Sequence, residues 1–175
     1  MSSSDLIRWG GLAAINGGVV WVVDALLILA IPESAVTDVL FIIAVLSTVG
    51  GLIGFHALQK ANYGRIGRGG FWTVVVGSLA QILGLIVLLV GSTALEWLVF
   101  PVGSLAVFIG FVLYGAATLQ ARVLPRWCGI GFIVGPVLFL SGAFGGILFG
   151  LLWLALGYML WSKRDTSVGQ PSRVR

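Results

Sequence analysis

Charged residues are scarce in this chain of 175 residues. Lysine and arginine together number 10, aspartate and glutamate number 6, and 59% of the residues are hydrophobic. A soluble domain of this length has too little interior to hide so much apolar surface, so the composition excludes a soluble fold. The solvent that suits such a chain is the lipid bilayer, and no polar stretch is long enough to form a second domain.

Cysteine and histidine occur once each, as Cys128 and His56. A single cysteine excludes an intrachain disulfide, and one cysteine and one histidine on different runs lack the spacing of a metal site. We expect Cys128 to be a small buried residue and His56 to lie near a membrane interface. Phosphate-binding loops, dinucleotide fingerprints and paired haem-ligating histidines are also missing. The sequence therefore predicts no metal, no cofactor, no catalytic residue and no enzymatic activity.

Long apolar runs fill the space between short stretches that hold all ten basic residues. A helix needs about 20 apolar residues to cross about 30 Å of hydrocarbon, and each of the first four runs fits one crossing. The last run, 127–162, has 36 residues and would reach about 54 Å as one helix. That run is longer than one membrane span requires and slightly shorter than two full spans would require.

The positions of the basic residues decide how the last run is threaded. Cytoplasmic loops are enriched in lysine and arginine, and a single last span would place the basic C-terminal residues outside the cell. Two short crossings with a break in the glycine-rich stretch 141–146 return those residues to the cytoplasm. A re-entrant hairpin would satisfy the same charge pattern, so this alternative stays open.

The predicted fold class is therefore an all-α, polytopic transmembrane helix bundle with six spans, arranged as three helical hairpins, and with both termini in the cytoplasm. Residues 1–164 form the transmembrane domain, and the polar residues 165–175 form a disordered cytoplasmic tail. The six expected spans are 6–30, 36–58, 71–90, 98–119, 127–144 and 146–161.

The net charge of +4 is carried by residues that flank the spans. We therefore expect the partner of these residues to be the acidic headgroups of the cytoplasmic leaflet of the plasma membrane, and not nucleic acid. The residues expected to contact headgroups are Lys60, Arg65, Arg68, Arg122, Arg126, Lys163 and Arg164.

Glycine, by contrast, is abundant, with 26 residues. Several glycines recur every seven residues, as in Gly77/Gly84/Gly91 and Gly103/Gly110. This spacing keeps small residues on one side of a helix and lets a second helix approach closely. We interpret these positions first as packing surfaces within the bundle. Contact with a second copy of the chain or with another membrane protein is the alternative.

A few polar residues interrupt the apolar runs, and such residues are the default candidates for function in a membrane. Asp24 is the single charge inside a span. Counted from the nearest basic residue, Asn16 and Tyr114 fall about 12 Å into the bilayer, Gln81 about 20 Å and Asp24 about 24 Å. These depths predict a polar seam formed by Asp24, Asn16, Gln81 and Tyr114. If the seam is functional, Asp24 would be a protonatable carboxylate in a substrate or proton path. The alternative is that Asp24 only holds helices together.

Two segments, RWGGLAAINGGVVW at 8–21 and LPRWCGIGFIVG at 124–135, resemble patterns that recur in uncharacterised six-span membrane proteins of high-GC Gram-positive bacteria. The resemblance covers the starts of two helices and implies a fold type without an activity. Two main functional hypotheses follow from the sequence, and a third, a membrane-embedded enzyme acting on lipid, has the least support because no acid–base pair is visible. The first is a non-enzymatic helix-packing subunit or accessory of a membrane assembly. The second is a small transporter or channel whose path is lined by Asp24.

Overall fold

The computed structural model describes residues 3–31, 34–89, 91 and 93–162, with the side chains of 93–98 left out. This part of the chain forms six helices. Five of them contain segments long and apolar enough to cross a membrane, which indicates a multi-pass membrane protein, whereas α5 has 14 residues and is about 21 Å long. The helices are α1 (Ser3–Ala30), α2 (Ala35–Gln59), α3 (Gly64–Leu89), α4 (Thr93–Ala121), α5 (Arg126–Phe139) and α6 (Ala143–Ser162).

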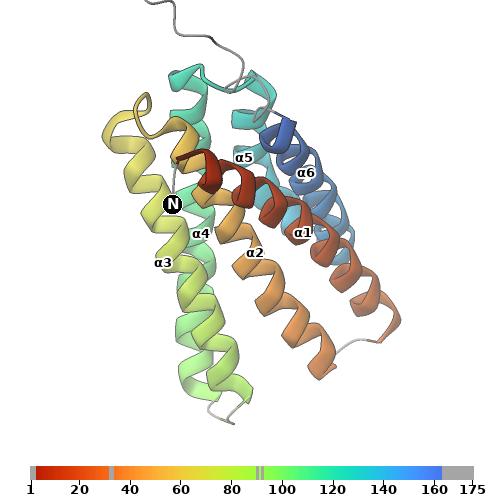
Figure 1. Ribbon diagram of the computed structural model, residues 1–175. Coiled ribbons are helices and arrows are strands. Elements are labelled where there is room, and N and C mark those ends of the chain that lie inside the picture. Colours follow the sequence, from red (N-terminus) through yellow and green to blue (C-terminus); the bar gives the residue numbers. More distant parts are fainter. Residues whose placement is uncertain (1–2, 32–33, 90, 92, 163–175) are drawn as a thin grey trace, which may run out of the picture.

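The helices form an antiparallel bundle in which some neighbours pack much more closely than others (Figure 1). α1 packs along both α2 and α6, α3 packs along α4, and α5 lies between α4 and α6. Contact between α2 and α3 is sparse although these helices follow each other in the chain. The bundle therefore consists of a group α1–α2–α6 and a pair α3–α4, which α5 connects on one side.

Glycines lie where the closely packed helices cross. A Cβ atom on Gly54 of α2 would lie 2.7 Å from the Cα atom of Gly10 on α1. A Cβ atom on Gly77 of α3 would lie 2.7 Å from the carbonyl oxygen of Gly103 on α4. Real side chains do not approach backbone atoms so closely, so the close approach of these helix pairs requires glycine.

The two ends of the bundle differ in charge. The first turn of α1, the α2–α3 connection, the α4–α5 connection and the last turn of α6 lie together, near the top of Figure 1. We call this the basic end, because it holds every basic residue that the structure describes. These residues are Arg8, Lys60, Arg65, Arg68, Arg122 and Arg126.

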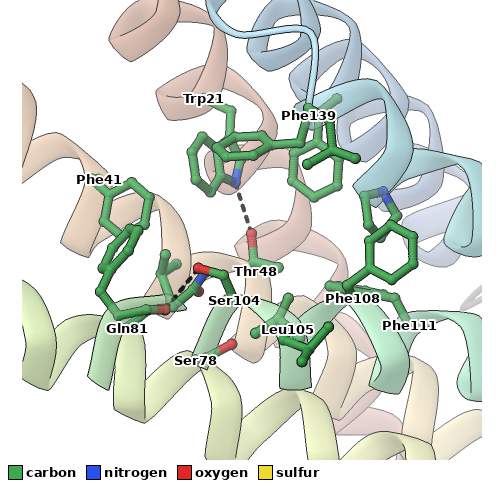
Figure 2. A pocket seen from close by; sticks show the side chains of 16 residues that line it. Trp21, Phe41, Thr48, Ser78, Gln81, Ser104, Leu105, Phe108, Phe111 and Phe139 are labelled. Atoms are coloured by element: carbon green, nitrogen blue, oxygen red, sulfur yellow. Dashed lines mark hydrogen bonds between the residues drawn. The ribbon is translucent and has the colours of Figure 1, made fainter. Parts of the chain in front are cut away.

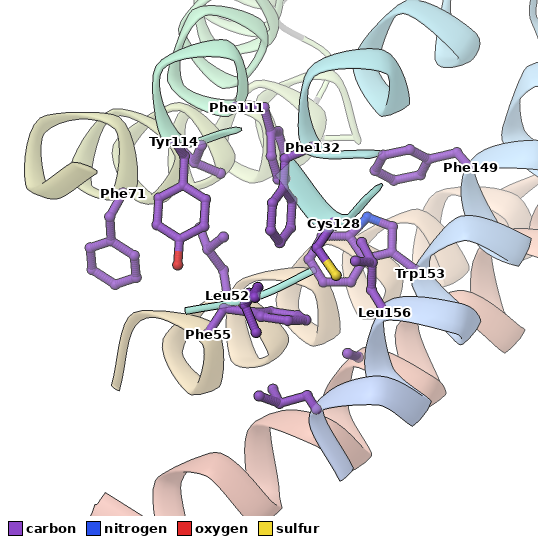
Figure 3. Close-up of a cluster of buried hydrophobic side chains, with 14 of the residues drawn as sticks. Leu52, Phe55, Phe71, Phe111, Tyr114, Cys128, Phe132, Phe149, Trp153 and Leu156 are labelled. Atoms are coloured by element: carbon purple, nitrogen blue, oxygen red, sulfur yellow. The ribbon is translucent and has the colours of Figure 1, made fainter. Parts of the chain in front are cut away.

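Aromatic side chains fill the middle of the bundle and the part toward the basic end (Figure 3). The ring of Phe132 lies 5.2 Å from the rings of both Phe55 and Tyr114 and 6.1 Å from that of Trp153. All four side chains are at most 2% exposed. Cys128 is fully buried nearby, which confirms the expectation of a small buried residue.

Several helix boundaries differ from the expected spans. α3 begins at Gly64 and α4 at Thr93, five to seven residues before the spans expected at 71 and 98. A helix can continue past the hydrocarbon because its backbone hydrogen bonds are internal, whereas hydropathy marks only the apolar part.

The break in the last apolar run lies earlier than expected, at residues 140–142. α5 ends at Phe139 and α6 begins at Ala143, so Gly145 and Gly146 lie inside α6 and not in the turn. Gly142 makes the turn with a φ of +69°, a value that favours glycine. Gly145 is needed for another reason, since a Cβ atom there would collide with the carbonyl group of Leu138. Lys163, Arg164 and the expected tail 165–175 lie outside the described residues.

Candidate functional site

A cavity of about 450 Å³ lies where α2 and α3 have little contact (Figure 2). Side chains from all six helices line this cavity, and most of them are apolar. The aromatic residues of the lining are Trp21, Phe41, Phe100, Phe108, Phe111, Phe139 and Phe149. The cavity can therefore surround an apolar molecule on several sides.

Two hydrogen-bonded pairs supply most of the polar groups in this lining. Trp21 Nε1 donates to Thr48 Oγ1 at 3.0 Å, and Gln81 Nε2 donates to Ser104 Oγ at 3.0 Å (Figure 2). The Ser104 hydroxyl in turn donates to the carbonyl oxygen of Phe100 at 2.9 Å. These bonds hold the donor groups in place, so the walls of the cavity present mainly hydrocarbon and aromatic rings.

A second cavity, of about 160 Å³, lies beside the first and toward the end opposite the basic end. Both cavities share Phe41 and Phe100 as lining residues. Asp24 lines the smaller cavity together with Thr37 and Asp38. The two cavities are thus neighbours that differ in character, since the larger is apolar and the smaller contains two carboxyl groups.

Asp24 is 2% exposed, and its Oδ1 atom has no hydrogen-bond partner among the described residues. Thr37 is close, but its hydroxyl donates to the carbonyl oxygen of Ser34 at 2.6 Å. Asp38 is half-buried and lies in the first turn of α2, whose helix dipole favours a negative charge. Asp24 lies in the interior of α1, far from the start of the helix, so no helix dipole stabilises a negative charge on its carboxyl group.

The structure separates the four residues of the expected polar seam. Asp24 and Gln81 line the two neighbouring cavities, whereas Asn16 and Tyr114 line neither. Asn16 is exposed on the outside of the bundle and donates through Nδ2 to Ser47 Oγ at 2.9 Å. Tyr114 is fully buried and accepts a hydrogen bond from another helix. The depths along the helices could not reveal these differences, because depth says nothing about how a helix is rotated.

The donor to Tyr114 is Gln59, a buried residue that the sequence analysis did not single out. Gln59 Nε2 donates to the Tyr114 hydroxyl at 3.3 Å, while Gln59 Oε1 has no partner among the described residues. The residue ends α2 next to Lys60, so it could be mistaken for part of a polar loop. Counted from the nearest basic residue, Gln59 lies only about 1.5 Å into the bilayer and Tyr114 about 12 Å, so depth along the helices gave no signal for this pair.

Tyr63 closes the basic end between α2 and α3. The Tyr63 side chain is 5% exposed, and its hydroxyl forms a hydrogen bond with His56 Nδ1. Burial raises the pKa of Tyr63 to about 12, against the opposing effect of nearby Arg68. His56 is half-buried and also lies against the ring of Phe71, so it is part of the packing at this end.

The basic residues expected to contact lipid headgroups are all exposed where the structure describes them. Trp9 and Trp72, each 60% exposed, lie near the same end, as indole rings do at a membrane interface. The exposed basic residues are Lys60, Arg65, Arg68, Arg122 and Arg126.

Within the described part of the chain, no three His, Cys, Asp or Glu residues are grouped so that they could hold a metal ion. No family model matches the chain, and no curated protein or solved structure matches it significantly. The interpretation of the two cavities therefore rests on their own chemistry.

Proposed function

We propose that this chain is a non-enzymatic, multi-pass membrane protein that binds an apolar or amphipathic molecule in the larger cavity. The observation that carries this proposal is the cavity of about 450 Å³, lined mainly by apolar side chains from five helices, while α3 contributes the polar Ser78 and Gln81. Sites for small molecules commonly have volumes of about 300–1,000 Å³, with many apolar walls and few polar groups.

This geometry supports a small transporter or binding protein more than a helix-packing subunit. The heptad glycines Gly77 and Gly103 face each other within the bundle, so they are not free to pack against a second protein. A permanently open channel has little support, because Phe55, Phe132 and Trp153 fill the bundle between the cavity and the basic end. Assembly of several copies of the chain is a separate proposal, to which we assign no particular contact surface.

We place the basic end in the cytoplasm of the cell, with both termini on that side. This orientation rests on the positive-inside bias, since every described basic residue lies at that end. The six-span arrangement counts α5 and α6 as the last hairpin, although α5 is short. Both cavities would then lie in the outer half of the plasma membrane, where a molecule could enter from the outer leaflet.

Binding of a neutral probe tests the proposed function. The probe is N-(3,3-dimethylbutyl)dansylamide, whose fluorescence rises in apolar surroundings, added to the full chain in a maltoside detergent. Val45 is 3% exposed and lines the cavity, so Val45→Trp should fill the space and weaken binding about tenfold. Val76 is 61% exposed on α3, so Val76→Trp is the matched control and should bind normally. Absence of binding to the wild-type chain, or equal binding by both variants, contradicts the proposal.

A further inference from the structure

The smaller cavity contains a feature that the binding of an apolar molecule does not explain. The carboxylate of Asp24 is nearly fully buried, faces this cavity and has an oxygen without a partner among the described residues. A carboxylate in hydrocarbon is costly unless a positive charge or hydrogen-bond donors compensate it. The cavity beside Asp24 provides the space for such a group.

We infer that the smaller cavity binds the positively charged headgroup of an amphipathic organic cation, while the apolar body of the same molecule occupies the larger cavity. This inference rests on the proposed function and adds the chemical class of the ligand. Asp24 of α1 supplies the buried counter-charge, and Asp38 of α2 supplies a second carboxylate in the same lining.

The walls of the smaller cavity suit an alkylammonium group better than a metal ion. Phe41 and Phe100 lie with ring centroids 5.8 Å apart, and aromatic faces attract organic cations. Ile28 and Leu85 offer apolar contacts to methyl or methylene groups. A hard metal ion would need about six oxygen ligands, and the described lining supplies only two carboxyl groups and the hydroxyl of Thr37.

The relation between the two cavities supports a ligand with two chemical parts. Phe41 and Phe100 belong to both linings, so the two spaces adjoin at these rings, and a molecule that occupies both would extend past them. The volume of about 160 Å³ accommodates a headgroup, whereas the volume of about 450 Å³ accommodates a larger apolar body. A molecule with one positive charge at one end fits this arrangement.

A pair of probes that differ only in charge tests the inference. One is the neutral N-(3,3-dimethylbutyl)dansylamide, and the other is dansylamidoethyl-trimethylammonium, in which a quaternary nitrogen replaces the quaternary carbon. The wild-type chain in a neutral maltoside detergent should bind the cationic probe about tenfold more tightly than the neutral one. Asp24→Asn keeps the size of the side chain and removes its charge. This variant should lose the preference for the cation and bind the neutral probe as the wild type does.

The outcomes separate the inference from the proposed function. Equal binding of both probes by the wild type, or an unchanged cation preference in Asp24→Asn, overturns the inference and leaves the proposed function standing. Failure of the wild type to bind either probe overturns both. If Asp24→Asn does not fold, Asp38→Asn takes its place: a reduced cation preference, by about threefold, supports the inference, and an unchanged preference overturns it.

Discussion

The packed region around Phe132 and the region of the two cavities are built from the same kinds of side chains. Aromatic rings are frequent in both, yet Phe132 has rings on several sides whereas Phe108 faces the larger cavity. The difference lies in the spacing of the helices, because α1 packs closely against both α2 and α6 while α2 and α3 have few contacts. Composition therefore does not decide where a membrane bundle opens. The pattern of close helix contacts does.

Removal of a ring should have very different effects in the two regions. Phe132→Ala should lower the free energy of unfolding by about 3–5 kcal/mol, because it leaves a large void among buried rings. Phe108→Ala should cost about 1 kcal/mol, since this half-buried side chain already borders open space. Unfolding of the purified protein in mixed micelles with increasing denaturing detergent measures both values. If both variants lost the same free energy of unfolding, Phe108 would be packed as tightly as Phe132, and the cavity would be closed in the folded protein.

Added volume at a glycine tests the close contacts that make the packed region. Gly54→Val should destabilise the chain by about 3 kcal/mol, because its side chain would overlap the backbone of Gly10. Gly69→Val is the matched control in α3, where a Cβ atom meets nothing within 4 Å, and should change the stability little. The same unfolding assay compares the two variants. A small effect of Gly54→Val would mean that α1 and α2 can separate without cost.

Loss of a hydrogen bond should matter more in the packed region than beside the cavity. Tyr114→Phe leaves the amide of fully buried Gln59 without its partner and should cost about 1.5 kcal/mol. Ser104→Ala breaks the bond from Gln81 next to open space and should cost about 0.5 kcal/mol. A reversed order would indicate that water reaches Gln59 and that the basic end is less tightly packed than the cavity region.

The last prediction concerns pH and tests whether the basic end excludes water. The folded chain keeps the Tyr63 phenol protonated up to a pKa of about 12, whereas the unfolded chain loses that proton near pH 10. The stability that Tyr63 contributes is therefore complete below pH 10 and is lost as the pH rises to 12, with a loss of about 1 kcal/mol by pH 11. Tyr63→Phe should remove this part of the pH dependence. Titration of Tyr63 near pH 10, followed by tyrosinate absorbance, would contradict the prediction.

Much of the helix pattern followed from hydropathy and charge. The apolar runs and basic stretches predicted helices and connections near their observed places, because in hydrocarbon a backbone can satisfy its hydrogen bonds only within a helix or a closed barrel. The position of the last turn was harder to predict. Gly142, Gly145 and Gly146 look alike in the sequence, and only the structure shows that Gly142 makes the turn while Gly145 and Gly146 let α6 pack closely against α5 and α1.

The candidate site was predictable only in part. Asp24 stood out as a charge within a span, and its depth close to that of Gln81 matches their places in neighbouring cavities. Asn16 and Tyr114 had equally suitable depths but face other directions. The cavities themselves could not be derived from the sequence, since they lie where contact between α2 and α3 is sparse, which no local pattern encodes.

The sparse contact between α2 and α3 also has a mechanical consequence. These helices are joined at the basic end by the short connection 60–63 and have few contacts along their length, so the connection acts as the pivot of a lever. α2 has 25 residues and is about 37 Å long. A rotation of about 5° at the pivot therefore moves the far ends of the two helices apart by about 3 Å. Where Phe41 and Thr48 line the larger cavity, the same rotation would change the separation of the two helices by about 2 Å and so alter the width of the cavity.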